Sequence, residues 1–229
     1  MKAIILAGGK GTRLPKDEQK IPKCLVEVSG KPILQRQIEQ LRMHGFNTIR
    51  LSLGHRAGQV INWLNKNNFS NYIESIIETE PLGTGGGIKN AILNWNGSFV
   101  VLFGDILADF NFKKLIEKSE NGKYSVLTGV YINDVRGMGV LEYDKTGKIL
   151  AYKEKITEGV SGFINANASV LNVRDFKDMP QKFSAEYDFF PEIIKQGRLF
   201  LHKHNGYWFD CGTKERLINA RNFFTKIPE

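Results

Sequence analysis

Cysteine and long apolar segments are both scarce in this chain. The two cysteines among 229 residues, Cys24 and Cys211, are too few for a disulfide-stapled fold and too far apart for a metal-binding motif. The apolar run at residues 99–103 is far shorter than the roughly 20 residues that a membrane-spanning helix needs. We therefore expect reduced cysteines that serve packing, and no span of a membrane.

Signals for export and for clustered charge are also missing. No small-residue cleavage site follows the short apolar run near the N-terminus, which favours a cytoplasmic location. The net charge is +8, but the 32 basic residues are scattered among 24 acidic ones. This pattern favours small phosphorylated metabolites over nucleic acid as anionic partners.

The first half of the sequence alternates between strand and helix patterns. Strands are expected at residues 2–7, 48–53, 72–77 and 99–103. Helices are expected from Pro32 to a cap at Gly45 and at residues 59–64 and 88–93. This order predicts an α/β fold with a mostly parallel sheet flanked by helices, and the length makes one domain the default.

The texture of the sequence changes from residue 123 onward. Antiparallel strands are expected at residues 124–131, 139–143 and 149–152, with a turn at residues 144–147. Two closing helices, at residues 189–195 and 214–224, flank a short strand at residues 199–202. A substrate-binding half is expected to begin at this change.

A glycine-rich loop directly follows the first predicted strand. Because Gly8, Gly9 and Gly11 lack Cβ atoms, their backbone N–H groups can approach a phosphate or a planar base. Arg13 offers a planar fork of donors and Lys23 a compact positive charge, so together they could hold a triphosphate. The alternative is a tight turn with two solvated cations. A dinucleotide-binding loop fits less well, because its third glycine is replaced by leucine.

Two carboxylates lie beside glycines at the ends of predicted elements. Asp105 follows an apolar strand and Gly104, where open α/β sheets place ligand-binding groups. Mg²⁺ takes one or two carboxylates and completes its shell with water and phosphate oxygens. Asp210, in a turn before the last helix, is the best second ligand, and capping that helix together with Thr213 is its alternative role.

A second glycine cluster occupies residues 83–87, just after Glu80. Four glycines in five residues imply close approach by a flat or anionic ligand at the start of a helix. The Glu80 carboxylate only accepts hydrogen bonds, so it matches the donor edge of guanine better than the mixed edge of uracil. A solvent-exposed glutamate before a turn is the equal alternative.

Taken together, these motifs resemble the sugar-1-phosphate nucleotidyltransferase family. The segments that carry the resemblance are residues 6–14, 22–23, 78–86, 104–105, 154–155, 165–166 and 210–213. They cover nearly the whole chain in the family's order and are most similar to guanylyltransferases for mannose 1-phosphate and D-glycero-D-manno-heptose 1-phosphate. The resemblance implies a Rossmann-like, glycosyltransferase-A-like fold in a single domain, with a nucleotide-binding half at about residues 1–122 and a sugar-phosphate-binding half at about residues 123–229.

The resemblance also implies roles for individual residues. It assigns catalysis to Arg13, Lys23, Asp105 and Lys155, nucleotide binding to Leu6, Ala7, Gly8, Gly9, Gly11, Thr12, Glu80, Gly83 and Thr84, and sugar binding to Gly104, Gly139, Glu154 and Asn165. It places a Mg²⁺ cofactor on Asp105 and Asp210.

The implied reaction joins a nucleoside monophosphate from an NTP, with GTP as the best guess, to a sugar 1-phosphate and releases pyrophosphate. Uridylyl, cytidylyl and thymidylyl transfer stay open, because residues 85–88 also resemble a uridylyltransferase for N-acetylmuramic acid 1-phosphate. Two further hypotheses are a non-catalytic nucleotide-sugar-binding regulatory relative and a true glycosyltransferase. The expected partners are the NTP and the sugar 1-phosphate, without nucleic acid or membrane, and a homodimer is left open.

Overall fold

The computed structural model describes residues 1–153, 156–157 and 159–226, and the chain forms two compact units. Unit 1 comprises Met1–Pro81, Leu102–Asp109 and Tyr207–Glu229, and unit 2 comprises Leu82–Val101 and Phe110–Gly206. Each unit is therefore built from segments that lie far apart in the sequence. The expected division into a nucleotide-binding half and a sugar-phosphate-binding half near residue 122 concerns bound ligands, and it stays a prediction.

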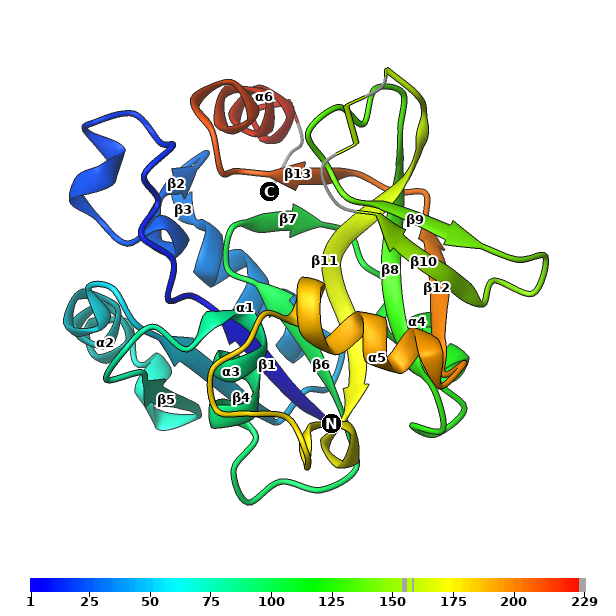
Figure 1. Cartoon of the computed structure of the whole chain (residues 1–229). Helices are drawn as coiled ribbons and strands as arrows, with labels where there is room; N and C mark the ends of the chain where they lie inside the picture. The colour runs from blue at the N-terminus through cyan, green and yellow to red at the C-terminus, as the bar shows by residue number, and fades with distance from the viewer. Residues whose placement is uncertain (154–155, 158, 227–229) are drawn as a thin grey trace. The chain divides into compact units, whose positions relative to one another are not determined.

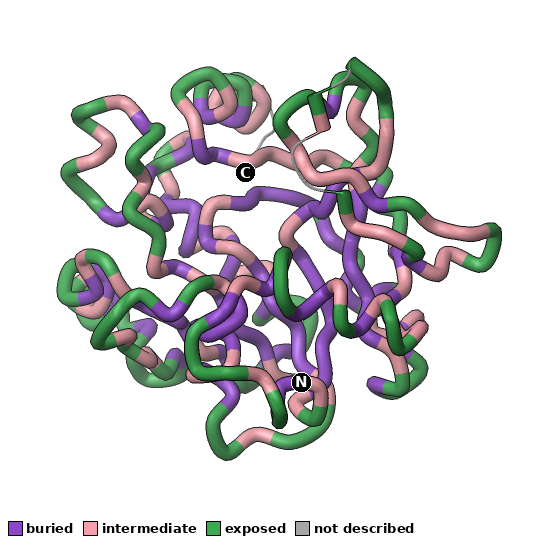
Figure 2. The backbone as a smooth tube through the Cα atoms, in the orientation of Figure 1, coloured by how far each residue is buried: buried purple, intermediate pink, exposed green. Residues whose placement is uncertain are grey.

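A parallel sheet forms the centre of unit 1, as the alternating pattern predicts. Its strands are β1 (Lys2–Leu6), β4 (Thr48–Leu53) and β5 (Ile73–Ile77), with β4 paired to both others. Helices α1 (Ile33–Met43) and α2 (Ala57–Lys66) connect them. Strands β1 and β4 are buried along most of their length (Figure 2), and most of their buried side chains are apolar, with Ser52 as the polar exception.

Helix α1 follows from the spacing of its apolar residues. Ile33, Leu34, Ile38 and Leu41 are fully buried and recur at helical intervals. The helix ends before Gly45, whose φ of +78° suits glycine. The predicted helix is confirmed, except that Pro32 precedes it and does not form its first turn.

Unit 1 also contains a second, antiparallel pair of strands. Strand β6 (Ser98–Phe103) begins in unit 2 and ends in unit 1, and β7 (Ile106–Ala108) follows it. Strand β7 pairs antiparallel with β13 (Trp208–Asp210), which leads into α6 (Lys214–Phe224) (Figure 1). A short hairpin of β2 (Glu27–Val28) and β3 (Lys31–Pro32) completes the regular structure, together with the 3₁₀ helices η1 (Glu18–Lys20), η2 (Lys23–Leu25) and η3 (Phe69–Asn71).

Unit 2 contains a mixed sheet. Its strands are β8 (Ser125–Ile132), β9 (Val140–Tyr143), β10 (Ile149–Lys153), β11 (Gly162–Asn172) and β12 (Leu199–His204). The pairs β10–β9, β9–β11 and β11–β8 are antiparallel, whereas β12 and β8 are parallel. Strand β11 was not expected, because an irregularity at residues 165–169 interrupts its alternation.

The helices of unit 2 differ most from expectation. They are α3 (Gly83–Ala91), α4 (Phe112–Lys118) and α5 (Phe190–Lys195), with the 3₁₀ helix η4 (Val173–Phe176) and a π-helix, η5 (Ala185–Phe189), that leads into α5. The expected start of α3 at Ile88 is wrong, since the helix begins five residues earlier at Gly83. Glycine disfavours helices by about 1 kcal/mol per residue, so the glycine cluster hid this helix from a propensity-based prediction.

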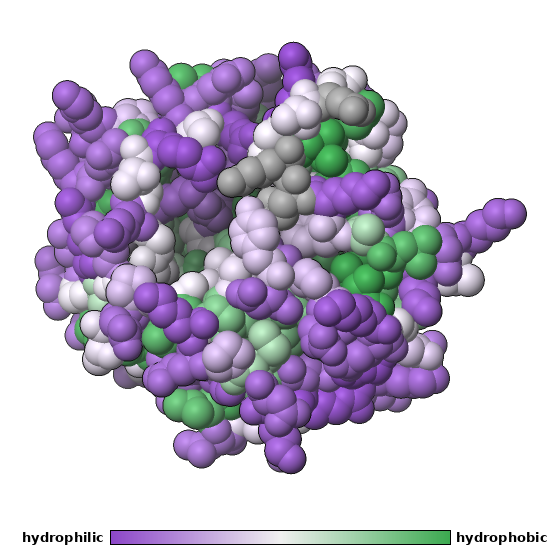
Figure 3. Space-filling model, viewed as in Figure 1, coloured by the Kyte–Doolittle hydropathy of each residue, from purple (hydrophilic) through white to green (hydrophobic). Residues whose placement is uncertain are grey.

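The surface agrees with the mixed composition. The face drawn in Figure 3 is mostly hydrophilic, with apolar residues in small groups. Among the described residues, none of the helices has both the length and the apolar character needed to cross a membrane.

Candidate active site

The first glycine-rich loop lies in unit 1 at the carboxyl end of β1. Its entry is fixed by hydrogen bonds from the Ala7 N–H to the Ser52 carbonyl at 2.8 Å and from the His55 N–H to the Gly8 carbonyl at 3.3 Å. A Cβ on Gly8 would lie 3.3 Å from the backbone nitrogen of Gly54, whereas a Cβ on Gly9 would meet nothing within 4 Å. The exposed backbone at Gly9 is therefore open to a ligand.

Hydrogen bonds hold the backbone of the loop on both sides of Arg13. The Gln19 side chain donates to the carbonyls of Thr12 at 3.1 Å and Leu14 at 2.6 Å. Leu14 is buried in an apolar cluster while Arg13 is exposed. The Arg13 guanidinium is thus available to an anion from a backbone that is held on both sides.

Hydrogen bonds from other parts of unit 1 hold the backbone on both sides of Asp105. The Gln37 side-chain amide is 3% exposed and donates to the carbonyls of Phe103 and Ile106, each at 2.8 Å. The Gly104 N–H donates to the Leu6 carbonyl at 2.8 Å, and a Cβ on Gly104 would lie 2.9 Å from that oxygen. A larger residue at position 104 would therefore displace Asp105.

The pairing of β7 with β13 brings Asp210 beside Asp105. Asp210 lies opposite Ile106 in the register, and the next residue, Cys211, donates its N–H to the Asp105 carbonyl at 2.8 Å. The Asp210 carboxylate also accepts from the Gly212 N–H at 2.8 Å. Two carboxylates that are 105 residues apart in sequence thus meet in one place.

Each carboxylate is paired with a cation. Lys23 forms an ion pair with Asp105, and Arg216 forms one with Asp210. A Cβ on Gly212 would lie 2.7 Å from Asp210 Oδ1, 2.8 Å from Lys23 Nζ and 3.6 Å from Arg13 Nη2. The structure therefore gathers Arg13, Lys23, Asp105 and Asp210 around Gly212, which leaves room for them because it has no side chain.

This donor set suits a hard divalent cation that brings its own oxygen ligands. The described residues contain no group of three or more His, Cys, Asp or Glu side chains placed to enclose a metal. Mg²⁺ needs only one or two carboxylates when phosphate oxygens and water complete its octahedron. Asp105 and Asp210 fit that requirement, and the metal would compete with Lys23 and Arg216 for them.

The two cysteines next to this cluster are chemically quiet. Cys24 and Cys211 are both buried, and this burial raises the pKa of each thiol to about 12. Each thiol therefore stays protonated near neutral pH, and neither is a ready nucleophile. The expectation that both are free packing residues is confirmed.

Helix α3 of unit 2 begins with the second glycine cluster, in which the Thr84 side chain forms two hydrogen bonds. The Thr84 hydroxyl donates to the Glu186 carboxylate at 2.6 Å and accepts from the Ala185 N–H at 2.9 Å. The Ser184 hydroxyl donates to the same carboxylate at 2.8 Å. This network ties the start of α3 to the π-helix, while Glu80, in unit 1, is exposed.

The residues expected to bind sugar are only partly described. Asn165 is 8% exposed, and its side chain accepts from the Asn167 N–H at 2.9 Å within the irregular part of β11. Gly139 immediately precedes β9. Glu154 and Lys155 lie outside the described residues.

Three residues of these sites were not anticipated. Gln37 lies on the apolar face of α1, and an amide in that stripe was the signal for a buried hydrogen-bonding role. Arg216 lies in the first turn of α6, six residues after Asp210, a spacing that carries no recognisable signal. Glu186 becomes meaningful only through its distant partner Thr84.

Comparison with known proteins decides the family. The family model described as "Nucleotidyl transferase" matches residues 2–227. The chain belongs to this nucleotidyl transferase family. A mannose-1-phosphate guanylyltransferase catalytic subunit beta from Drosophila melanogaster is 35% identical over 96% of this chain and 61% of its own length. The chain thus spans about three fifths of that relative.

Solved structures extend the comparison. HddC from Yersinia pseudotuberculosis, complexed with GMP-PN, is 36% identical with a TM-score of 0.85, over 97% of this chain and 99% of that protein. A UDP-glucose pyrophosphorylase complexed with UDP-glucose matches with a TM-score of 0.83 at 21% identity, over 98% of each chain, which supports the fold alone. The predicted α/β class, a mixed sheet flanked by helices, is confirmed.

Proposed function

We propose that this nucleotidyl transferase family member moves a guanylyl group from GTP to a sugar 1-phosphate and releases pyrophosphate in a Mg²⁺-dependent reaction. The gathering of Arg13, Lys23, Asp105 and Asp210 around Gly212 carries the proposal. Mannose 1-phosphate and D-glycero-D-manno-heptose 1-phosphate are the favoured acceptors. The cytoplasm, which supplies nucleoside triphosphates, is the expected compartment.

The chemistry requires positioning and charge more than a covalent intermediate. A sugar phosphate is already an anionic nucleophile at neutral pH, so no general base is needed. Arg13 and Lys23 would hold the phosphates of GTP and offset the charge that develops during transfer. Asp105 and Asp210 would hold Mg²⁺, which supplies further neutralisation of phosphate charge when bound.

The guanine preference is assigned to two features of the chain. Glu80 can accept from both donors on the Watson–Crick edge of guanine, and Gly83 with Thr84 would present backbone groups to the nucleotide. Sequence similarity to a guanylyltransferase, and to a protein crystallised with a guanine nucleotide, supports this assignment. Gly139, Glu154 and Asn165 would bind the sugar, with Lys155 on its phosphate.

One panel tests the reaction. All five common triphosphates are crossed with mannose, heptose, glucose and N-acetylmuramic acid 1-phosphates, and pyrophosphate release is measured with and without Mg²⁺. We expect turnover to be greatest with GTP and to require the divalent ion. Absence of pyrophosphate from every pair would favour a regulatory relative, and preference for UTP, dTTP or CTP would reject guanylyl transfer while keeping the class.

The base preference has its own variant. Glu80→Gln should narrow the lead of GTP over UTP by about tenfold or more, because glutamine presents a donor to the guanine donors. Glu78→Gln is the matched control, since the Glu78 side chain already accepts from the Ser52 hydroxyl at 3.0 Å. Equal preference in Glu80→Gln and the wild type would assign base reading to backbone groups.

A further inference from the structure

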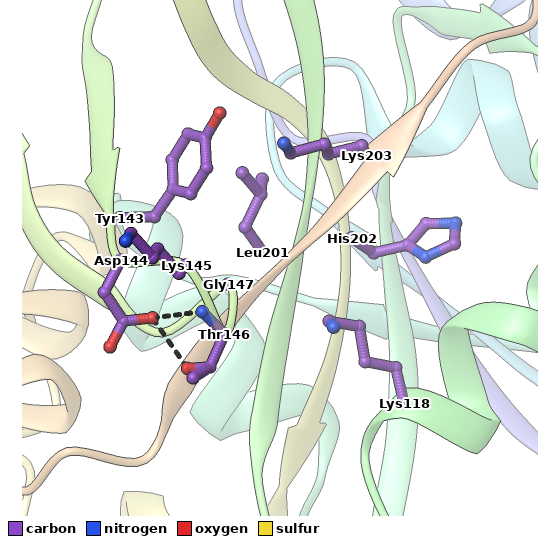
Figure 4. A pocket seen from close by; sticks show the side chains of 9 residues that line it. All are labelled: Lys118, Tyr143, Asp144, Lys145, Thr146, Gly147, Leu201, His202 and Lys203. Atoms are coloured by element: carbon purple, nitrogen blue, oxygen red, sulfur yellow. Dashed lines mark hydrogen bonds between the residues drawn. The ribbon is translucent and has the colours of Figure 1, made fainter.

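A basic hollow lies in unit 2, and none of the residues proposed for nucleotidyl transfer contributes to it. Its volume is about 290 Å³. The end of α4, the β9–β10 turn and strand β12 provide its walls (Figure 4). The lining residues are Lys118, Tyr143, Asp144, Lys145, Thr146, Gly147, Leu201, His202 and Lys203.

The turn that forms one wall is rigidly connected to the strand that forms another. The Leu201 N–H donates to the Gly147 carbonyl at 2.7 Å, and Gly147 has a φ of +84°. A Cβ on Gly147 would lie 3.6 Å from Lys118 Nζ. The Lys118 ammonium group therefore lies against this turn, at ordinary van der Waals distance from position 147.

The lysines of the hollow lack acidic partners in the described part of the chain. Among those residues, Lys118, Lys145 and Lys203 form no ion pair with a carboxylate. Lys203 instead lies over the Tyr143 ring, with its Nζ 4.6 Å from the ring centroid. Because a cation–π contact leaves an ammonium group able to donate hydrogen bonds, these lysines can still bind an anion.

The carboxylate that lines the hollow is already engaged. Asp144 Oδ1 accepts from the Thr146 N–H at 2.8 Å, the Thr146 hydroxyl at 2.6 Å and the Lys148 N–H at 3.0 Å. These bonds, led by the Thr146 hydroxyl, hold the pKa of Asp144 below its ordinary value. The carboxylate stabilises the turn and leaves a net excess of positive charge in the hollow.

The pKa of His202 is sensitive to the positive charge around the hollow. Partial burial, followed by the charges of Lys118, His204 and Lys114, lowers the pKa of His202. The His202 ring lies on the same side of β12 as Lys118 (Figure 4), where a neutral imidazole can donate one N–H to an anion without adding positive charge.

We propose that this hollow binds the phosphate group of a small phosphorylated molecule. The three ammonium groups and the Asp144 carboxylate together carry a net charge of +2, which matches a phosphate dianion, and the partly exposed Tyr143 ring offers an apolar surface to an attached carbon skeleton. The volume is just below the usual range for small-molecule sites, about 300–1,000 Å³, which fits a phosphorylated sugar better than a larger ligand. The site is separate in composition from the proposed transfer site, so its occupation does not depend on that function.

Histidine side-chain NMR tests the proposal on the full-length chain. Only four histidines are present, and the His202 signals are assigned by their loss in His202→Gln. Inorganic phosphate should shift these signals saturably, whereas chloride at matched ionic strength should not. Mannose 6-phosphate should bind more tightly than phosphate, because its carbon skeleton contacts the Tyr143 wall.

Charge variants complete the test. Lys118→Gln combined with Lys145→Gln should weaken phosphate binding about fivefold or more, since two charge-assisted contacts are lost at a partly exposed site. Lys113→Gln, on the same helix but outside the hollow, should bind like the wild type. Arg13→Ala combined with Lys23→Ala should also leave the His202 response intact, which separates this site from the transfer site. Equal shifts with chloride, or equal affinity in the Lys118/Lys145 and Lys113 variants, would overturn the proposal.

Discussion

A Cβ on Gly9 would meet nothing within 4 Å, whereas a Cβ on Gly86 would overlap the Gln181 carbonyl oxygen and approach the Leu82 Cβ at 2.8 Å. Both glycines belong to clusters that the sequence presents as ligand loops. At Gly9, in the first cluster, the missing side chain leaves the backbone open to solvent. In the second it allows α3 to pack against residues 181–185 of the same unit.

The comparison separates two reasons for a glycine-rich segment. Gly85 and Gly86 are buried, and their N–H groups both donate to the Phe183 carbonyl, at 3.1 and 3.2 Å. Close packing explains why glycine occupies these two positions, and no ligand is needed to account for them. A Cβ on Gly83 would also lie 2.5 Å from the Phe183 carbonyl oxygen, and its φ is +78°, so packing and backbone conformation account for this glycine as well. Because Gly83 and Thr84 lie at the less buried start of α3, they stay nucleotide-binding candidates of that cluster.

Removing charge from unit 1 should have the largest effect on activity. Asp105→Asn and Asp210→Asn each remove a proposed metal ligand at nearly constant size, so the turnover rate should fall on the order of a hundredfold or more. Rates across a Mg²⁺ series, with circular dichroism to verify folding, provide the measurement. Near wild-type rates at limiting Mg²⁺ would show that the substituted carboxylate does not hold the metal.

The cations beside the first loop come next. Alanine at Arg13 or Lys23 should weaken GTP binding or slow transfer by well over tenfold, because a charge-assisted contact contributes about 1.5–3 kcal/mol. Lys20→Ala is a control, since its ammonium group pairs at the surface with Asp17 at 3.1 Å. If the Michaelis constant for GTP and the rate both stayed unchanged, the loop would be a turn with solvated cations.

Alanine at the glycines tests the comparison directly. Gly86→Ala should lower the free energy of unfolding by about 1–3 kcal/mol, because the added methyl group must displace the backbone at Gln181. The better helix propensity of alanine offsets up to about 1 kcal/mol of this loss. Gly9→Ala should change stability by less than about 0.5 kcal/mol yet reduce turnover. Thermal and urea unfolding of both variants, with turnover assays, measures the difference; equal destabilisation would remove the distinction between the two clusters.

The smallest effect is expected at the link between Thr84 and Glu186. Glu186→Gln replaces charge-assisted bonds with neutral ones, which should lower the free energy of unfolding by about 1 kcal/mol. Because Glu186 holds Thr84, the Michaelis constant for GTP should rise more than that for the sugar phosphate. A rise of equal size in both constants would indicate general loosening of unit 2. Glu192→Gln, on α5, serves as the control because its ion pair with Lys195 lies at the surface.

Much of unit 1 could be predicted because local patterns and tertiary packing agree there. Strand β4 and helix α6 have the bounds that their sequence periodicity predicts. In unit 2 the two disagree: glycine-rich α3 is helical although its residues disfavour helices, and β11 continues through a bulge where Asn167 has a φ of +59°. Close packing in the first case and side-chain hydrogen bonding in the second overcome the local preference.

The sequence by itself determined the chemical types of the candidate site: flexible glycines after a buried strand, two cations and two carboxylates beside glycines. Those features are local, since each depends on a residue and its immediate neighbours. The family resemblance implied that Asp105 and Asp210 share a metal, and the pairing of β7 with β13 is the tertiary relation that brings them together. Only the tertiary structure decided that Gln37 fixes the backbone around Asp105 and that Arg216 shares the cluster. These relations depend on pairing between strands and helices that are distant in sequence, and such pairing follows from packing of the whole unit, which no local pattern encodes.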